Sequence, residues 1–269
     1  MRIPRLALLA GALAGVLFAG TAHAATTSAA PSYKPVLAKN PLYKTGKLGV
    51  TECEEPEVRN GTVEEAEQYF QAVMDCLSKA WSPVVKKAGY RFSAPKLTVI
   101  TKVGTKIPSC GRFPDGAQAV YCPTTRSISF LLSADVVEEP TDLLLMQGLA
   151  HEYGHHVQQL TGIIKATDVI MLKDTESRAY EALRRSELQA QCLSAAFVGR
   201  VWDSLRRPDT DWSILLKGHH NMVAALGARS GSEETHGSHP SNRYWLERGF
   251  KAQSASACNT FAAPKNRVH

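Results

Sequence analysis

The feature that most constrains the fold of this chain is the stretch LAHEYGHHVQQL at residues 149–160, which holds three histidines and a glutamate within six positions. On a helix each residue advances by about 100° around the axis. The apolar side chains of residues 141–161 then fall on one stripe that we expect to face the core, namely Leu143, Met146, Ala150, Tyr153, Val157 and Leu160. The opposite side carries His151, His155, Gly148, Gln158 and Gly162. The two histidines are therefore not expected to be core residues.

His151 and His155 are four residues apart, so one lies a helical turn above the other and both imidazoles can bind the same ion. Glu152 points to one side of the pair. Its carboxylate can reach a metal-bound water rather than the metal, which is the position of a general base. His-Glu-x-x-His fixes only three positions, so an exposed polar helix is the alternative interpretation. His156 lies away from the pair and is interpreted as a bystander.

A catalytic zinc site with two histidines needs a third protein ligand. In one extended form of the motif, a glycine and a third histidine follow three and six residues after the second histidine. Gln158 and Thr161 occupy those positions here, which excludes that form.

A glutamate from the following helix, expected over residues 175–206, is the other option, and the candidates are Glu176, Glu181 and Glu187. Glu176 lies at the start of that helix, and Glu181 shares its side with charged residues. Glu187 lies on a stripe with fewer charges and small residues, where a carboxylate needs a partner such as a metal. The pattern favours Glu187 without excluding the other two.

The N-terminus has the pattern of a signal peptide over residues 1–24. Two arginines precede an uncharged apolar run at residues 6–20, and Ala22-His23-Ala24 has the small-x-small pattern of a cleavage site. We expect cleavage after Ala24 and a secreted protein, with an uncleaved anchor as the alternative. No cysteine follows the run, which argues against a lipid anchor.

Removing 24 residues leaves 245 of the 269, enough for one large domain or two small ones. The first part of this mature chain, residues 25–50, is rich in small and polar residues without periodicity, and we expect a flexible N-terminal arm. A single domain is expected over residues 51–262, followed by a tail at residues 263–269.

All six cysteines lie in the mature chain: Cys53, Cys76, Cys110, Cys122, Cys192 and Cys258. An even count in an exported chain indicates three disulfides, for which fifteen pairings are possible. Cys110 and Cys122 flank a stretch with glycine and proline, where a local bridge is plausible. Oxidised cysteines argue against a cysteine nucleophile, and no Gly-x-Ser-x-Gly stretch supports a serine nucleophile.

The formal charge is +6, and loss of Arg2 and Arg5 with the signal peptide lowers it to +4. The basic pairs Lys86-Lys87, Arg184-Arg185 and Arg206-Arg207 are interpreted as solvated helix faces. No aromatic residues are interleaved with them, so no nucleic-acid partner is expected. No segment after the leader is long and apolar enough for a stable membrane span.

The remaining pattern predicts an α+β fold. A helix starts at Thr62, where Glu65 completes a capping box, and its apolar set follows helical spacing through Val84. Strands are expected at residues 96–102 and 127–133. Helices follow at residues 141–161, 175–206, 211–228 and 240–251. A small sheet is thus followed by a helical half.

Several blocks of sequence, in this order, resemble the bacterial family of putative neutral zinc metallopeptidases. They are YCP at 121–123, HEYGHHVQ at 151–158, ELQAQC at 187–192, THGS at 235–238, RYWLERGF at 243–250 and CNTF at 258–261. The resemblance runs patchily from about residue 110 to 261. It implies a zincin-like domain of the glutamate-zinc type, in which a small sheet packs on an active-site helix and a second helix carries the third ligand.

Carried over to these positions, the resemblance implies one zinc ion held by His151, His155 and Glu187, with Glu152 as base and proton shuttle. It also suggests a disulfide between Cys192 and Cys258. We further expect Cys53 to pair with Cys76.

Further roles are expected around this site. His236 is the candidate donor to the oxyanion, in competition with His239 and with the interpretation of a surface-loop histidine. His219 and His220 are expected to decorate their helix. The strand at 127–133 is a candidate to bind substrate backbone as an added strand.

Gln191 departs from the family, which usually has aspartate four residues after the third ligand. An acid there typically orients a zinc-binding histidine. The Gln191 amide oxygen can accept the same hydrogen bond but carries no charge.

Two functions follow as hypotheses. The first is a secreted zinc metalloendopeptidase that hydrolyses peptide or protein substrates with one zinc ion. The second, motivated by Gln191, is a catalytically weakened or inactive zinc-bound scaffold that binds peptide or cell-envelope partners. A protein without any metal is the third interpretation.

Overall fold

The computed structural model describes residues 32–49, 52–56, 62–132, 143–217 and 235–269. The expected signal peptide and the residues after 217 of the helix expected at 211–228 lie outside these ranges. The helices are α1 (Pro35–Ala38), α2 (Val63–Lys87), α4 (Leu143–Leu160), α5 (Ile163–Lys173), α6 (Glu176–Leu205) and α9 (His239–Ala252). Short 3-10 turns are η1 (Pro41–Lys44), η2 (Ala255–Cys258), η3 (Thr260–Ala262) and η4 (Lys265–Arg267). Residues 209–217 are also helical.

The strands form two small sheets on one side of the helices. They are β1 (Lys96–Ile100), β2 (Lys106–Ile107), β3 (Gly111–Arg112), β4 (Ala119–Cys122) and β5 (Ser127–Leu131). The larger sheet has the order β1-β5-β4, with β1 parallel and β4 antiparallel to β5. The second sheet pairs β2 with β3. A small mixed sheet with a helical half confirms the α+β prediction.

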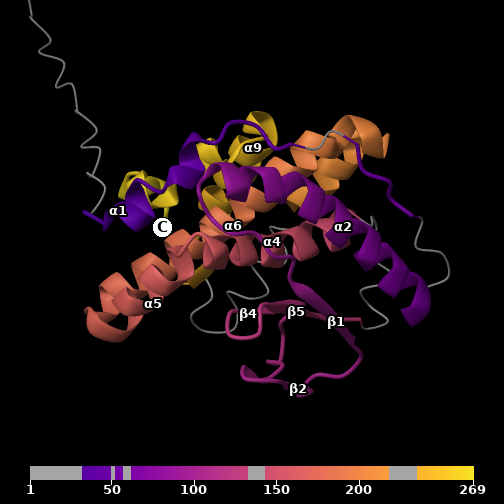
Figure 1. Ribbon diagram of the computed structural model, residues 1–269, viewed down its shortest axis with the longest axis horizontal. Helices are drawn as coiled ribbons and strands as arrows, with labels where there is room; N and C mark the ends of the chain where they lie inside the picture. The colour runs from indigo at the N-terminus through magenta and orange to yellow at the C-terminus, as the bar shows by residue number, and fades with distance from the viewer. Residues whose placement is uncertain (1–31, 50–51, 57–61, 133–142, 218–234) are drawn as a thin grey trace, which may run out of the picture.

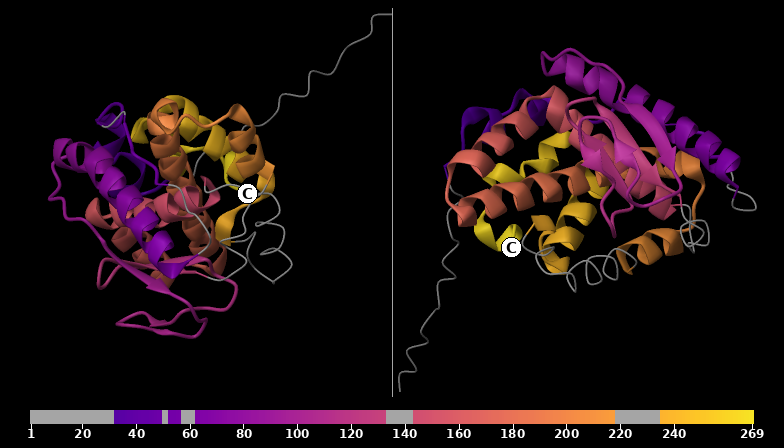
Figure 2. Two further views of the ribbon diagram at one scale, coloured as in Figure 1. Left: turned by 90° about the vertical axis from the view of Figure 1, so that its right-hand side faces the viewer. Right: turned by 90° about the horizontal axis from the view of Figure 1, so that it is seen from below.

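The elements are stacked in layers around α4 and α6 (Figure 1). α4 contacts the sheet through β4 and β5, and it contacts α6 on another side. α9 packs on α6, and α2 crosses α4. Figure 2 shows the sheet and α9 at opposite ends of this stack. α4 therefore lies between the sheet and α6, which places its residues at the centre of the molecule.

The predicted start and core face of α2 are confirmed. The Thr62 side chain accepts a hydrogen bond from the Glu65 backbone N–H and caps the helix. Every predicted core residue of α2 is buried: Ala66, Tyr69, Phe70, Val73, Met74, Leu77, Ala80, Trp81 and Val84. On α4 the predicted stripe is buried from Leu143 to Val157, and Leu160 is half-buried.

The prediction of a flexible arm is wrong for residues 32–49. These residues form α1 and η1, and they bury the side chains of Leu37, Leu42 and Leu48 in the core. The three leucines follow neither a helical nor a strand period, so the pattern alone gave no sign of burial.

The prediction of a tail at residues 263–269 is also wrong. Val268 is buried, and its carbonyl accepts a hydrogen bond from Arg184 on α6. The Trp245 indole N–H donates to the Arg267 carbonyl, and the Ser238 N–H donates to the His269 carbonyl. Both ends of the described chain therefore belong to the packed fold.

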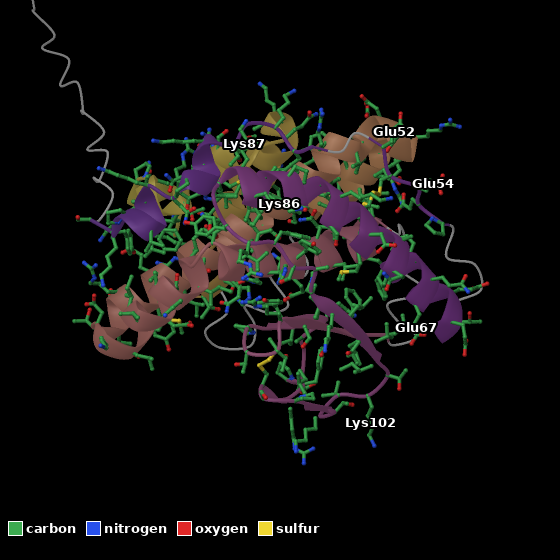
Figure 3. All side chains as sticks on the ribbon, in the orientation of Figure 1. Glu52, Glu54, Glu67, Lys86, Lys87 and Lys102 are labelled. Atoms are coloured by element: carbon green, nitrogen blue, oxygen red, sulfur yellow. A yellow bond between two sulfur atoms is a disulfide. The ribbon has the colours of Figure 1, made fainter. Side chains whose placement is uncertain are left out.

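Only part of the basic surface is solvated as predicted. Lys86 and Lys87 are exposed on α2, as are the labelled Glu52, Glu54 and Glu67 elsewhere on the surface (Figure 3). Arg185, however, is completely buried, where it pairs with Glu181 and donates to the carbonyls of Thr260 and Ala263. The buried guanidinium thus ties α6 to the C-terminal segment.

Arg207 is the second exception. It is half-buried and pairs with Glu55 and Asp211. A charged pair in a sequence does not reveal such partners, because they come from elsewhere in the chain.

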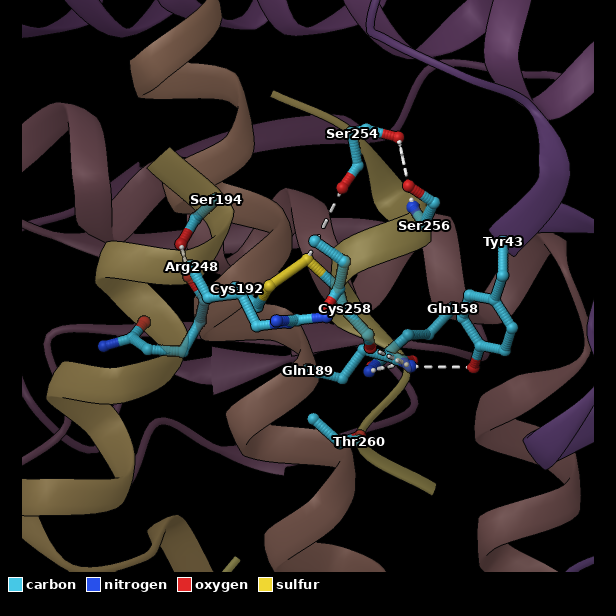
Figure 4. Close-up of a disulfide and its surroundings, with 12 residues drawn as sticks. Tyr43, Gln158, Gln189, Cys192, Ser194, Arg248, Ser254, Ser256, Cys258 and Thr260 are labelled. Carbon is cyan, nitrogen blue, oxygen red and sulfur yellow. Dashed lines mark hydrogen bonds between the residues drawn. A yellow bond between two sulfur atoms is a disulfide. The ribbon is translucent and has the colours of Figure 1, made fainter. Parts of the chain in front are cut away.

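Three disulfides join Cys53 to Cys76, Cys110 to Cys122 and Cys192 to Cys258, which confirms all three expected pairings. The third links α6 to η2 (Figure 4). Within the described ranges, no helix combines the length and the apolar character that a bilayer crossing requires.

We predict that Leu42→Ala destabilises the protein by about 2–5 kcal/mol, because it removes a completely buried side chain and leaves a cavity. The free energy of unfolding would be measured by urea denaturation. Leu172→Ala is the matched control, since Leu172 is 84% exposed and its truncation should change stability by less than about 0.5 kcal/mol. Equal small effects of both variants would contradict the packed position of the N-terminal segment.

Candidate metal centre

The candidate site lies beside a close contact between α4 and α6 at Gly154. A Cβ atom at Gly154 would lie 3.0 Å from the Ala190 carbonyl oxygen and 3.1 Å from its Cα. Such contacts are tighter than most Cβ contacts in proteins, so a side chain here would push α6 away from α4 by a few tenths of an ångström. Gly154 lies between His151 and His155, and Ala190 follows Glu187 by three residues.

The structure brings together the side chains of His151, His155 and Glu187. The two Nε2 atoms are 3.1 Å apart. The Glu187 Oε2 atom lies 3.3 Å from Nε2 of His151 and 3.2 Å from Nε2 of His155. All three side chains are half-buried. One ligand atom from each residue is thus directed at a common point.

The orientation of the His155 ring is set by Gln158, one turn further along α4. The Gln158 amide nitrogen donates to the Ser186 carbonyl, which can only accept, so its Oε1 faces the other way. This Oε1 lies 2.9 Å from Nδ1 of His155, and it also accepts from the Ser186 hydroxyl. His155 therefore carries its proton on Nδ1 and presents the lone pair of Nε2 to the site.

Gln191 holds the second histidine in the same way. Its Oε1 lies 2.8 Å from Nδ1 of His151. The hydrogen bond expected of Gln191 from the sequence is thus present in the structure. Two neutral amides, one from each helix, direct both imidazoles with Nε2 inward.

The lone pairs of the two Nε2 atoms and of the Glu187 oxygen point at one another. Without a proton or a metal cation between them, these lone pairs repel one another. Two imidazole nitrogens and one carboxylate form a donor set that zinc binds in catalytic sites. Within the part of the chain that the structure describes, these three residues are the group of histidine, cysteine and acidic side chains close enough to share an ion. The residues present therefore fit a zinc ion.

The electrostatics of the metal-free site also indicate that a cation is favoured there. Burial lowers the pKa of His155, but the adjacent Glu187 carboxylate more than offsets this and raises the net pKa to about 9. Burial raises the pKa of Glu187, yet the two histidines beside it hold that pKa well below its ordinary value. Glu187 is therefore an anion, and a proton on His155 can take the position of the cation.

The other two glutamates considered as ligands lie elsewhere. Glu181 pairs with the buried Arg185 and lies 3.7 Å from Nζ of Lys265. Glu176 is exposed at the first position of α6.

A cleft of about 380 Å³ opens beside the three converging side chains. Glu152 lines this cleft together with the candidate ligands but does not belong to the converging group. The cleft volume falls in the range of small-ligand sites.

Of the further histidines, the structure brings His236 to the cleft. Its side chain is 46% exposed, and its Nε2 lies 3.7 Å from Oε2 of Glu187. Nδ1 of the same ring lies 2.7 Å from the Thr235 hydroxyl. His239 begins α9 and is not among the residues that line the cleft. His219 and His220 lie outside the described residues.

His156 is set apart from the ligand group but is more than a bystander. It is completely buried, and its Nε2 donates to the Ser93 carbonyl over 2.6 Å. Its Nδ1 accepts from the Tyr121 hydroxyl over 3.0 Å. Burial lowers the pKa of His156 to about 4, so the ring is neutral at pH 7. It fixes β4, which carries Tyr121, against α4.

The strand beside the cleft is β4 rather than the one expected from the sequence. β5, at residues 127–131, is paired on both sides and has no free edge for a peptide. β4 is an edge of the described sheet, and Ala119, Val120 and Tyr121 line the cleft. The expectation that residues 127–133 bind substrate backbone is therefore wrong, because the order of strands cannot be read from local pattern.

The sequence patterns did not single out Gln158 or α5. Gln158 was placed on the face of His151 and His155 and excluded an extended motif, but its place three residues after His155 was not interpreted as that of a partner. α5 follows α4 after Gly162, which adopts a left-handed conformation at φ +77°. Four residues of α5 line the cleft: Ile164, Thr167, Asp168 and Met171.

We predict that Gln158→Met weakens zinc binding by ~10–100-fold, because the variant keeps a similar volume but loses the acceptor that orients His155. Zinc affinity would be measured by competition with a chelating dye. Gln159→Met is the matched control, since Gln159 is the next residue of α4 and does not line the cleft. An unchanged zinc affinity in a folded Gln158→Met variant would contradict the role of this amide.

Comparison with known proteins gives one family match. The model of the family described as "Putative neutral zinc metallopeptidase" matches residues 44–261, well beyond the part in which the sequence blocks were recognised.

Two curated relatives are similar over most of their length. The chain is 25% identical over 214 residues to "Uncharacterized protein YpfJ" of Escherichia coli (strain K12), covering 74% of this chain and 72% of the relative. It is 24% identical over 218 residues to "Uncharacterized protein Rv2575" of Mycobacterium tuberculosis (strain ATCC 25618 / H37Rv), covering 71% and 69%. No solved structure matches the chain.

Proposed function

Because the chain belongs to the family of putative neutral zinc metallopeptidases, we propose that it is a zinc-dependent endopeptidase. The observation that supports this most strongly is the convergence of two Nε2 lone pairs and one carboxylate oxygen beside a cleft that also contains a glutamate. His151, His155 and Glu187 would hold one zinc ion, and Glu152 would act as the general base.

When bound, zinc supplies a Lewis acid that lowers the pKa of a coordinated water to about 7 and polarises the scissile carbonyl. Glu152 then accepts a proton from the attacking water on its carboxylate. The same carboxylate delivers that proton to the amine that leaves. The glutamines behind the two histidines keep the imidazole rings in the orientation that this requires.

His236 is the proposed donor to the oxyanion that develops on the carbonyl. The position of its Nε2 at the cleft, 3.7 Å from Glu187, is compatible with a donor on the substrate side. β4, which is an edge strand of the described sheet, is the proposed support for the substrate backbone, which would add as a further strand.

The protein is proposed to act outside the cell. The leader-like residues 1–24 and the three disulfides support export, since disulfides persist in oxidising compartments. Peptides or proteins of that compartment would be the substrates.

We predict that Glu152→Gln lowers peptide cleavage by ~10²–10⁴-fold while zinc binding is retained, because the variant removes the base and keeps the three ligands. Cleavage of a broad peptide library would be followed by mass spectrometry, with zinc content measured in the same samples. Glu176→Gln is the control, since Glu176 is exposed and outside the cleft, and it should keep full activity.

The alternative of a zinc-bound scaffold rests on the uncharged Gln191. It predicts that the zinc-loaded wild type cleaves nothing and that binding of peptides is unaffected by Glu152→Gln. Cleavage by the wild type that persists undiminished in Glu152→Gln would argue against Glu152 as the base.

Gln191→Glu provides a second test of the same alternative. A carboxylate in the place of the amide makes His151 a more basic ligand, so we expect tighter zinc binding. If the neutral amide limits catalysis, cleavage by this variant rises by ~10-fold or more. If the wild type is already a competent enzyme, zinc affinity rises with little change in the cleavage rate.

A further inference from the structure

One wall of the cleft is a single face of α5. Ile164, Thr167, Asp168 and Met171 all line the cleft. Their spacing of three, four and seven residues from Ile164 places them on one side of a helix. On this face a carboxylate lies one turn after the isoleucine and almost one turn before the methionine. Leu183 of α6 adds a third aliphatic side chain to the lining.

Asp168 differs from the other two acids of the cleft because neither the fold nor the proposed chemistry accounts for it. Glu187 contacts the two histidines, and Glu152 is the proposed base. Asp168 is exposed, and no described side chain forms a hydrogen bond or an ion pair with it. The described residues that line the cleft include no lysine or arginine. Burial raises the pKa of Asp168, as expected for a carboxylate that lacks a cation.

We propose that Asp168 selects substrates with a lysine or arginine side chain, whose charged end it binds within the cleft. This inference rests on the proposed peptidase function, which it extends to a class of substrate. The aliphatic stem of such a side chain would pack along Ile164, Met171 and Leu183, and its cationic end would reach the carboxylate. A purely apolar side chain would contact the aliphatic residues but leave the Asp168 carboxylate without a cation. An acidic side chain would be repelled by that carboxylate.

The size of the effect follows from the exposure of Asp168. Charge-assisted hydrogen bonds are the strong ones, but an exposed pair is screened by solvent and salt. We therefore expect about a tenfold preference for basic over neutral side chains of similar length, and a smaller preference at high ionic strength.

The test uses the zinc-loaded full chain and peptides that are acetylated at the N-terminus and amidated at the C-terminus. One position at a time is varied among lysine, arginine, norleucine and glutamate, and kcat/KM is measured for each peptide. The wild type should prefer lysine and arginine over norleucine by about tenfold. Asp168→Asn should lose this preference, so that kcat/KM becomes similar for the lysine, arginine and norleucine peptides.

Two further variants sharpen the comparison. Asp168→Lys should favour the glutamate peptides over the lysine peptides. Asp203→Asn removes an exposed acid of α6 that does not line the cleft, and it should keep the wild-type preference. Because Asp168 is exposed and has no ion-pair partner among the described residues, Asp168→Asn and Asp168→Lys should leave the melting temperature unchanged.

A preference for basic side chains that survives Asp168→Asn would overturn the inference and leave the peptidase function intact. The absence of any preference in an active wild type would do the same.

A binding measurement separates failure of the inference from failure of the proposed function. Fluorescence anisotropy of labelled peptides on zinc-loaded Glu152→Gln reports selection without catalysis. If the wild type cleaves nothing, the peptidase function fails. If this variant then binds lysine peptides more tightly than norleucine peptides, and if the added substitution Asp168→Asn removes the difference, Asp168 is still supported as the selecting residue. Equal binding of the two peptides would overturn the inference.

Discussion

The close contact between Gly154 of α4 and Ala190 of α6 is the constraint on which the candidate site depends. It sets the distance between the two helices at the level where one carries two histidines and the other a glutamate. Residues that belong to the candidate site lie directly beside these two contact positions in the sequence. Gly154 is flanked by the histidine pair, while Ala190 is followed at once by Gln191, which orients His151. A larger side chain at either position would move Glu187 away from the two histidines and Gln191 away from His151.

The polar residues behind the histidines connect the site to both ends of the described chain. Gln158 donates to the amide oxygen of Gln189, which in turn donates to the Tyr43 hydroxyl and to the Cys258 carbonyl (Figure 4). Tyr43 belongs to η1, and Cys258 is bonded to Cys192 on α6. The orientation of His155 is therefore supported by segments more than two hundred residues apart in the sequence.

The helical part of the fold could be predicted because long amphipathic patterns determine which face is buried. The spacing of the apolar residues predicts the core faces of α2 and α4. His151 and His155 lie on the side of α4 opposite its core face, and they line the cleft. The approach of Glu187 was favoured by the residue pattern over Glu176 and Glu181, which it left open. Its neighbours on the helix are small, and this is a local signal of close packing.

The remaining parts depend on contacts that local pattern does not contain. β2 and β3 have two residues each, too few for an alternation to be recognised. β4 gains its role from its place at the edge of the sheet, which follows from strand order. The burial of Leu37, Leu42 and Arg185 is decided by partners far along the chain. Gln158 acquires its function only when α6 supplies Ser186 to fix its amide.

The meeting of the two chain ends on α6 has a consequence for the order of folding. Leu48 donates its N–H to the Gln253 carbonyl, the Asn259 side chain donates to the Ala38 carbonyl, and Ser254 donates to the Gly46 carbonyl. Contacts of such large sequence separation form late, since the intervening chain must first be confined. A chain made from its N-terminus lacks these particular partners of residues 38–48 until residues 253–259 have emerged. The contacts that hold residues 38–48 against residues 253–259 therefore form after the proposed metal ligands at residues 151–187 have already been made.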